Sequence, residues 1–203
     1  MLGGIGWQAM LLATPGLLLG LVLHELAHAW TADRLGDPTA RLAGRLTLNP
    51  LAHLDPLGTV LLLLFGFGWA RPTPVEPANL RSPRRDDVLV TAAGPLANLG
   101  LAFAALLALR ALPGLGASGA SALWTVAAVN VYLAVFNLLP VPPLDGSHLL
   151  FGLAGLSRER SAQIQQMGGL LLLLLVATRR VGDFLAPAAG WLLGQLARAA
   201  GLG

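Results

Sequence analysis

Residues 15–30 read PGLLLGLVLHELAHAW, an apolar run that contains two histidines and one glutamate. The run belongs to an apolar segment, residues 6–30. As a helix rising about 1.5 Å per residue, this segment can cross the roughly 30 Å hydrocarbon layer of a bilayer. It lacks a positively charged start and a small-residue cleavage site, so we interpret it as a retained membrane helix.

The composition of the chain also indicates a membrane protein. Of its 203 residues, 55% are hydrophobic and only 11% are charged, whereas soluble domains carry about 25% charged residues. The net charge of +3 comes from arginine alone, and the arginines form clusters between apolar runs. Cytoplasmic loops of membrane proteins show this pattern, and nucleic-acid-binding proteins do not. We therefore expect a lipid bilayer as partner, and no nucleic acid.

The apolar segments predict an all-α polytopic membrane protein with about five to six membrane helices. Beyond the first segment, helices are expected at residues 88–112, 120–139, 161–178 and 183–198. We predict one integral membrane domain, residues 1–203. Its catalytic core would lie at about 6–150 and its C-terminal helices at about 160–200.

Two shorter segments are expected near the active site. Residues 31–55 are polar and contain alternating stretches such as residues 40–48, which predict a small β-hairpin or sheet whose edge could bind an extended substrate strand. The apolar run 57–69 is too short to span comfortably, so it predicts a re-entrant segment. If that run does not cross, both arginine-rich loops, within residues 31–55 and 70–87, lie on one side. The positive-inside rule makes that side cytoplasmic.

The motif His24-Glu25-Leu26-Ala27-His28 points to metal chemistry. Helical residues four apart share one face, so both imidazoles can bind a single ion. Glu25 can then take a proton from the attacking water. Zinc suits this reaction because it polarises the scissile carbonyl and lowers the pKa of water. Ionisable residues inside an apolar helix indicate function by default, although a polar helix end at the membrane surface is the alternative.

Catalytic zinc normally has three protein ligands and one position open to water. Because the chain has no cysteine, the third ligand must be a histidine or a carboxylate, and the candidates are His53, Asp55, Asp145 and His148. We favour Asp145 because it follows the 120–139 helix in a proline-broken segment, where exposed backbone can line a cavity. The alternative is that Asp145 and Gly146 only form a turn after the prolines.

Three more polar residues could position the substrate. Asn137 could hold a substrate strand or stabilise an oxyanion, but an inter-helix hydrogen bond explains it equally well. Asn98 follows Gly94 and Pro95, and close helix packing is the better explanation for it. The alternative is that Asn98 has a role near the active site. His53 is an accessory polar candidate.

These motifs together resemble the site-2 protease family of intramembrane zinc metalloproteases. The matching segments are residues 24–28, 49–58, 94–98 and 137–146, in the family's order. The resemblance implies that His24, His28 and Asp145 bind one zinc ion, that Glu25 is the general base and that Asn137 positions the substrate. It also implies a cytoplasm-facing site that cuts transmembrane proteins or remnant signal peptides. With no room for a PDZ insertion and no CBS domains, the chain is similar to a minimal form.

Two other function classes fit part of the pattern. An inert zinc-binding scaffold or chaperone would need no base such as Glu25 and would close all four metal positions. A metal transporter should carry ionisable residues along several helices, whereas these gather at one depth. We therefore expect a zinc metalloendopeptidase.

Overall fold

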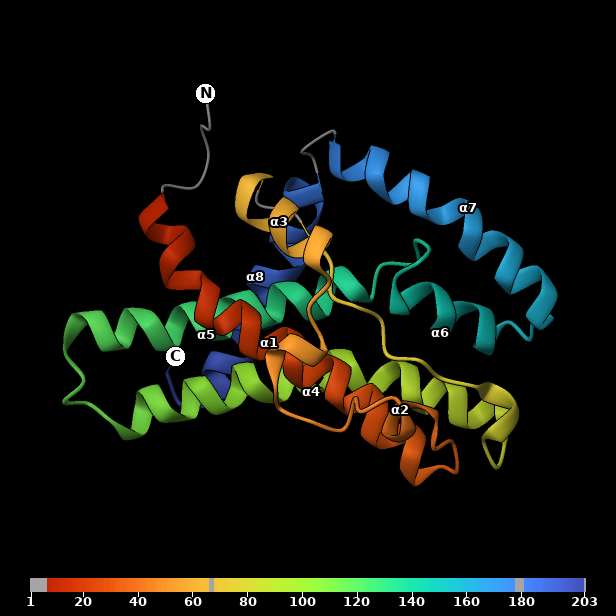
Figure 1. Ribbon diagram of the computed structural model, residues 1–203. Helices are drawn as coiled ribbons and strands as arrows, with labels where there is room; N and C mark the ends of the chain where they lie inside the picture. Colours follow the sequence, from red (N-terminus) through yellow and green to blue (C-terminus); the bar gives the residue numbers. More distant parts are fainter. Residues whose placement is uncertain (1–6, 66–67, 178–180, 203) are drawn as a thin grey trace. The chain divides into compact units, whose positions relative to one another are not determined.

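A computed structural model describes residues 7–65, 68–177 and 181–202. Within these ranges the regular elements are helices, which confirms the all-α class (Figure 1). The helices are α1 (Trp7–Arg34), α2 (Thr39–Leu42), α3 (Pro56–Phe65), α4 (Pro83–Ala111), α5 (Gly116–Asn137), α6 (Asp145–Leu153), α7 (Arg158–Ala177) and α8 (Val181–Ala199). Two 3-10 turns, η1 (Pro50–Ala52) and η2 (Pro77–Asn79), complete the set.

Three of the described helices are long and apolar enough to cross a membrane. They are α1, of which residues Leu12–Arg34 form the candidate span, α4 and α5. The expected count of five to six membrane helices is therefore wrong for the described part of the chain. Helices α7 and α8 form where helices were predicted but do not belong to these three. The first half of α7 is polar, and α8 has a charged residue near each end, Asp183 and Arg198.

The predicted β-hairpin at residues 40–48 is also wrong. The segment begins with the single-turn helix α2, and its next backbone N–H groups bond locally, from Gly44 to Arg41 O at 3.0 Å and from Arg45 to Ala40 O at 2.9 Å. Gly44 has a φ of +69°, which turns the chain and ends any extended run. The described residues contain one isolated β-bridge, Leu54 with Ala70, so no edge strand at 40–48 is available to a substrate.

The chain divides into two compact units. Unit 1 comprises Met1–Gly20 and Pro95–Gly203, and unit 2 comprises Leu21–Gly94. In unit 1, α8 packs against α5, and small residues of α4, α5 and α8 form the core. Two fully buried asparagines hold the helices of unit 1 together. Asn98 donates to Gly20 O and Asn130 Oδ1, both at 3.0 Å, and Asn130 donates to Gly16 O at 3.1 Å.

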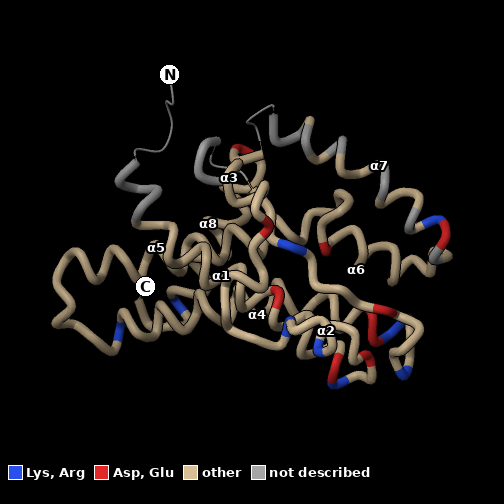
Figure 2. The backbone as a smooth tube through the Cα atoms, viewed as in Figure 1, with Lys and Arg blue, Asp and Glu red and all other residues tan. Residues whose placement is uncertain are grey.

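Unit 2 contains most of the charged residues of the chain, which gather around α2 and the first turn of α4 (Figure 2). Its loops are joined by the fully buried Asp37. This carboxylate accepts hydrogen bonds from the Thr39 amide and hydroxyl, from the Glu76 amide at 2.7 Å and from Asn79 Nδ2 at 3.0 Å. Burial raises the pKa of Asp37, but these bonds outweigh it and the pKa is lowered.

Candidate active site

The two histidines of the motif lie one turn apart on α1 and are buried, at 6% exposed for His24 and 8% for His28. Their Nε2 atoms are 3.0 Å apart, and the rings meet edge to face. Two ligands on a tetrahedral zinc, at Zn–N distances of about 2.0–2.1 Å, would lie about 3.3 Å apart. The spacing of the two nitrogens therefore fits one shared zinc ion.

Helix α4 fixes the ring of His28. Nδ1 of His28 lies 2.7 Å from the carbonyl oxygen of Val90. Because a carbonyl only accepts, Nδ1 must carry the proton and Nε2 presents a lone pair, which is the form that a metal requires. One turn later on α4, Gly94 lies against both rings, and a β-carbon there would overlap Nε2 of His28.

Glu25 is held by a residue 48 positions away. The Thr73 amide donates to Glu25 Oε2 at 2.8 Å, and the Thr73 hydroxyl donates to the same oxygen at 2.7 Å. The hydroxyl also lies 3.0 Å from the backbone oxygen of Glu25. The general-base candidate is 9% exposed, so two donors on its carboxylate offset the cost of burying a charge.

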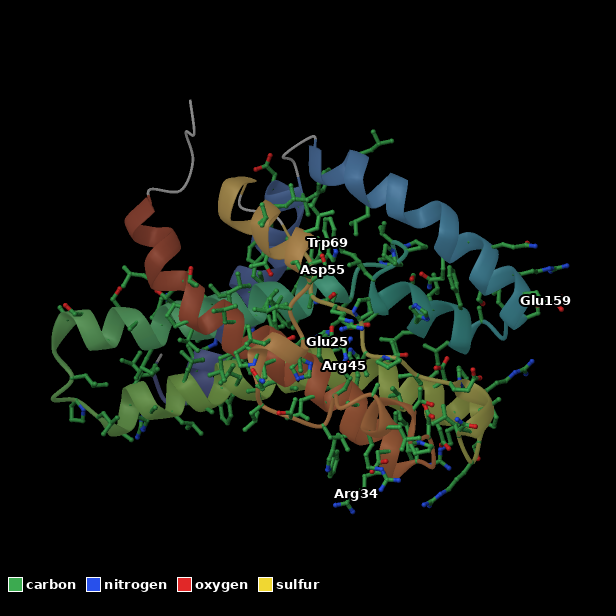
Figure 3. The ribbon with its side chains drawn as sticks, in the orientation of Figure 1. Glu25, Arg34, Arg45, Asp55, Trp69 and Glu159 are labelled. Carbon is green, nitrogen blue, oxygen red and sulfur yellow. The ribbon has the colours of Figure 1, made fainter. Side chains whose placement is uncertain are left out.

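Arg45 lies near Glu25 in unit 2 (Figure 3). Its side chain is 4% exposed and donates to the carbonyl oxygens of Arg71 at 3.1 Å and Pro72 at 3.3 Å, the two residues that precede Thr73. Burial lowers the pKa of Arg45, as does the charge of Arg71, while the charge of Glu25 acts in the opposite direction.

His53 and Asp55 have contacts that suit structural roles. His53 is fully buried, with Nε2 2.8 Å from Thr47 O and with no hydrogen-bond partner for Nδ1 among the described residues. Asp55 accepts from the Gly58 amide at 2.8 Å and so caps the start of α3. These contacts support a structural reading of Asp55, whereas substrate contact by His53 stays a prediction.

The remaining candidates belong to unit 1. The bonds of Asn98 to Gly20 and Asn130 support its packing role. Asn137 ends α5 and donates to Leu133 O at 3.0 Å within its own helix. Asp145 is the half-buried first residue of α6, and His148 is exposed on the same helix. The ligand role of Asp145 and the substrate roles of Asn98 and Asn137 stay predictions.

The sequence analysis missed Thr73 and Arg45, and it noted Gly94 only for helix packing. One available signal was the pair of prolines around Thr73, which stiffens the backbone there and leaves one N–H donor in residues 72–74. Nothing in the sequence showed that this donor would meet Glu25.

Comparison with known proteins identifies the family. Residues 114–176 match the family model "Peptidase family M50". Over 171 residues the chain is 42% identical to "Putative zinc metalloprotease YwhC" of Bacillus subtilis (strain 168), covering 80% of this chain and 78% of that protein. The chain belongs to peptidase family M50.

Other M50 relatives agree. "Putative zinc metalloprotease Rip2" of Mycolicibacterium smegmatis is 33% identical over 178 residues, covering 83% of this chain and 67% of that protein. The protein of the same name from Mycobacterium tuberculosis (strain ATCC 25618 / H37Rv) is 34% identical over 190 residues, covering 88% of this chain and 69% of that protein. No solved structure gives a significant match. The resemblance to the site-2 protease family is thus confirmed, and the relatives' names agree with zinc as the cofactor and peptide-bond hydrolysis as the reaction.

Proposed function

We propose that this M50 protein is an intramembrane zinc metalloprotease, with His24, His28 and Asp145 as zinc ligands and Glu25 as general base. Each of the three ligands offers one atom that zinc accepts, an imidazole nitrogen or a carboxylate oxygen. The observation that carries the proposal is the pair of Nε2 atoms 3.0 Å apart, buried in a helix of spanning length beside a carboxylate. When bound, zinc polarises the scissile carbonyl and lowers the pKa of the attacking water.

Glu25 carries the proton through the reaction. Its carboxylate takes a proton from the water as the water oxygen bonds to the carbonyl carbon of the substrate. The same carboxyl group then gives that proton to the amide nitrogen as the carbon–nitrogen bond breaks. The products are a new carboxyl terminus and a new amine. Because a helical peptide bond is shielded by its neighbours, the substrate must unwind locally before this can happen.

The proposed substrate is a transmembrane segment or a remnant signal peptide, reached from the cytoplasmic side. The arginines of unit 2 support this side, because short arginine-rich loops remain in the cytoplasm. The absence of native cysteine allows a direct test by single-cysteine labelling. An impermeant maleimide should label Arg41→Cys in inside-out vesicles and not in intact cells, whereas Ser118→Cys, in the first turn of α5, should show the reverse. Labelling of Arg41→Cys in intact cells would overturn the proposed orientation.

Cleavage of a transmembrane reporter in liposomes, together with zinc analysis, tests the chemistry. We expect wild type to cut and Glu25→Gln to retain about one zinc per chain while losing roughly 10²–10⁴-fold in rate, as is typical for a general base. Asp145→Asn should lose zinc as well as activity. Glu159→Gln is the matched control, because it makes the same chemical change at an exposed position on α7.

Two results would count against the proposal. Zinc bound by wild type with no cleavage of any transmembrane reporter would favour the inert scaffold. Full zinc binding in Asp145→Asn would remove Asp145 from the ligand set and leave the two histidines with an unidentified third partner.

A further inference from the structure

We infer that Thr73 is a positioning residue for Glu25, and that the 70–76 segment serves to aim the carboxylate of the general base. This inference rests on the proposed function of Glu25. It concerns a residue outside the metal-binding motif, on a loop that the motif does not predict.

Two hydrogen bonds from Thr73 converge on one carboxylate oxygen of Glu25. The amide and the hydroxyl of Thr73 both donate to Oε2 of Glu25, at 2.8 Å and 2.7 Å. Two donors on one oxygen fix the carboxylate plane, since rotation about the last side-chain bond would break both. The other oxygen, Oε1, is then the one that can face a water molecule and take its proton.

The segment is itself held on both sides of Thr73. Before it, Arg45 binds the carbonyls of Arg71 and Pro72, and the Arg71 amide donates to His53 O at 2.7 Å. After it, the Glu76 amide donates to Asp37 at 2.7 Å.

The prolines on either side of Thr73 make the contact specific. Pro72 and Pro74 have no N–H group, so Thr73 supplies the one backbone donor of residues 72–74. That donor and the adjacent hydroxyl both reach Glu25. A segment that served only to close a loop would not need both donors to end on the carboxylate of the general base.

Substitutions at Thr73 separate positioning from folding. Thr73→Val keeps the shape and removes the hydroxyl, so we expect kcat to fall about tenfold with KM within twofold, with bound zinc unchanged and with only a small fall in melting temperature from the lost hydrogen bond. Thr73→Ser should restore kcat to within about threefold of wild type. Thr59→Val is the matched control, because among the described residues that half-buried hydroxyl bonds to the backbone oxygen of Asp55, at 2.7 Å, and not to Glu25. A wild-type kcat in Thr73→Val would overturn the inference. So would a fall in kcat that is proportional to a loss of bound zinc or of folded protein and that Thr73→Ser does not restore.

Residue-resolved amide exchange provides a readout that needs neither zinc nor cleavage. In metal-free protein, Glu25→Ala removes the acceptor, so exchange of the Thr73 amide should rise at least tenfold. Glu25→Gln keeps one acceptor oxygen, so it should raise the exchange rate of the Thr73 amide less than Glu25→Ala does. The Arg71 and Glu76 amides have other acceptors and should be unchanged.

The exchange result distinguishes the two levels of the argument. Unchanged Thr73 exchange in Glu25→Ala, with an active wild type, would remove the role of Thr73 and leave the protease assignment standing. If Glu25→Ala speeds exchange of the Thr73 amide but the wild type cuts no reporter, the contact stands and the proposed function falls, and with it any catalytic role of Thr73.

Discussion

Gly94 of α4 lies so close to His28 of α1 that a β-carbon on residue 94 would overlap Nε2 of the imidazole and lie 2.7 Å from Cε1 of His24. The absence of a side chain at this position therefore leaves room for both rings. Because Nε2 is the nitrogen that faces its partner histidine, a displaced ring would also misplace the proposed metal ligands.

Gly94→Ala should accordingly lower bound zinc to less than half of the wild-type amount and cut activity at least tenfold, because ligand geometry tolerates little displacement. Metal analysis and reporter cleavage measure both effects. Gly100→Ala is the control on the same helix, since a β-carbon there meets no atom within 4 Å. Equal zinc contents in the two variants would show that the close approach does not matter for binding.

Arg45→Lys should loosen the 70–76 segment even though it keeps the positive charge. The guanidinium binds two consecutive carbonyls, those of Arg71 and Pro72, and a single ammonium cannot reproduce this geometry. We expect faster amide exchange at Thr73 and a loss of roughly 1–3 kcal/mol in unfolding free energy.

Arg41→Lys is the matched control for that change. Its side chain is 61% exposed and pairs with Asp33 at 3.1 Å, and exposed pairs contribute about 0–1 kcal/mol. If the two variants exchange at the same rate at Thr73, the contacts of Arg45 do not hold the segment.

The sequence predicted the parts of this protein that depend on local spacing. His24 and His28 share one face of α1 because they lie four residues apart, which allows their nitrogens to meet. Residues 40–48 were misread because their alternation is short, and local bonds around Asp37 and the left-handed Gly44 compete with strand pairing. The contact of Thr73 with Glu25 spans 48 residues and rests on the path of a loop, which no periodicity encodes.

Asp37→Asn should destabilise unit 2 in a pH-dependent way. The folded pKa of Asp37 lies below its usual value of 3.8, so the unfolded chain binds the proton more readily. The carboxylate therefore contributes stability that is present above about pH 4 and lost as the pH falls through the lowered folded pKa. Asparagine replaces one acceptor oxygen with a donor, which removes this contribution at neutral pH.

We expect Asp37→Asn to lose roughly 1–3 kcal/mol at pH 7, with the gap to wild type closing below about pH 4. Melting of metal-free protein, followed by tryptophan fluorescence from pH 7 to pH 2.5, measures this gap. Asp33→Asn, at a partly exposed ion pair, should change little at pH 7. A gap that stayed constant down to pH 2.5 would mean that shape, and not charge, makes Asp37 important.

Asn98 offers the sharpest choice between packing and catalysis. Its amide donates to Gly20 O and to Asn130, so Asn98→Ala should cost about 1–2 kcal/mol, the value found for hydrogen bonds between membrane helices in peptides. Asn130→Ala breaks the same shared bond, and the double variant should therefore cost less than the sum of the two single variants. For a packing residue, kcat per folded molecule should stay within about twofold of wild type in all three. A tenfold loss of kcat in Asn98→Ala but not in Asn130→Ala, at equal melting temperature, would instead place Asn98 at the substrate.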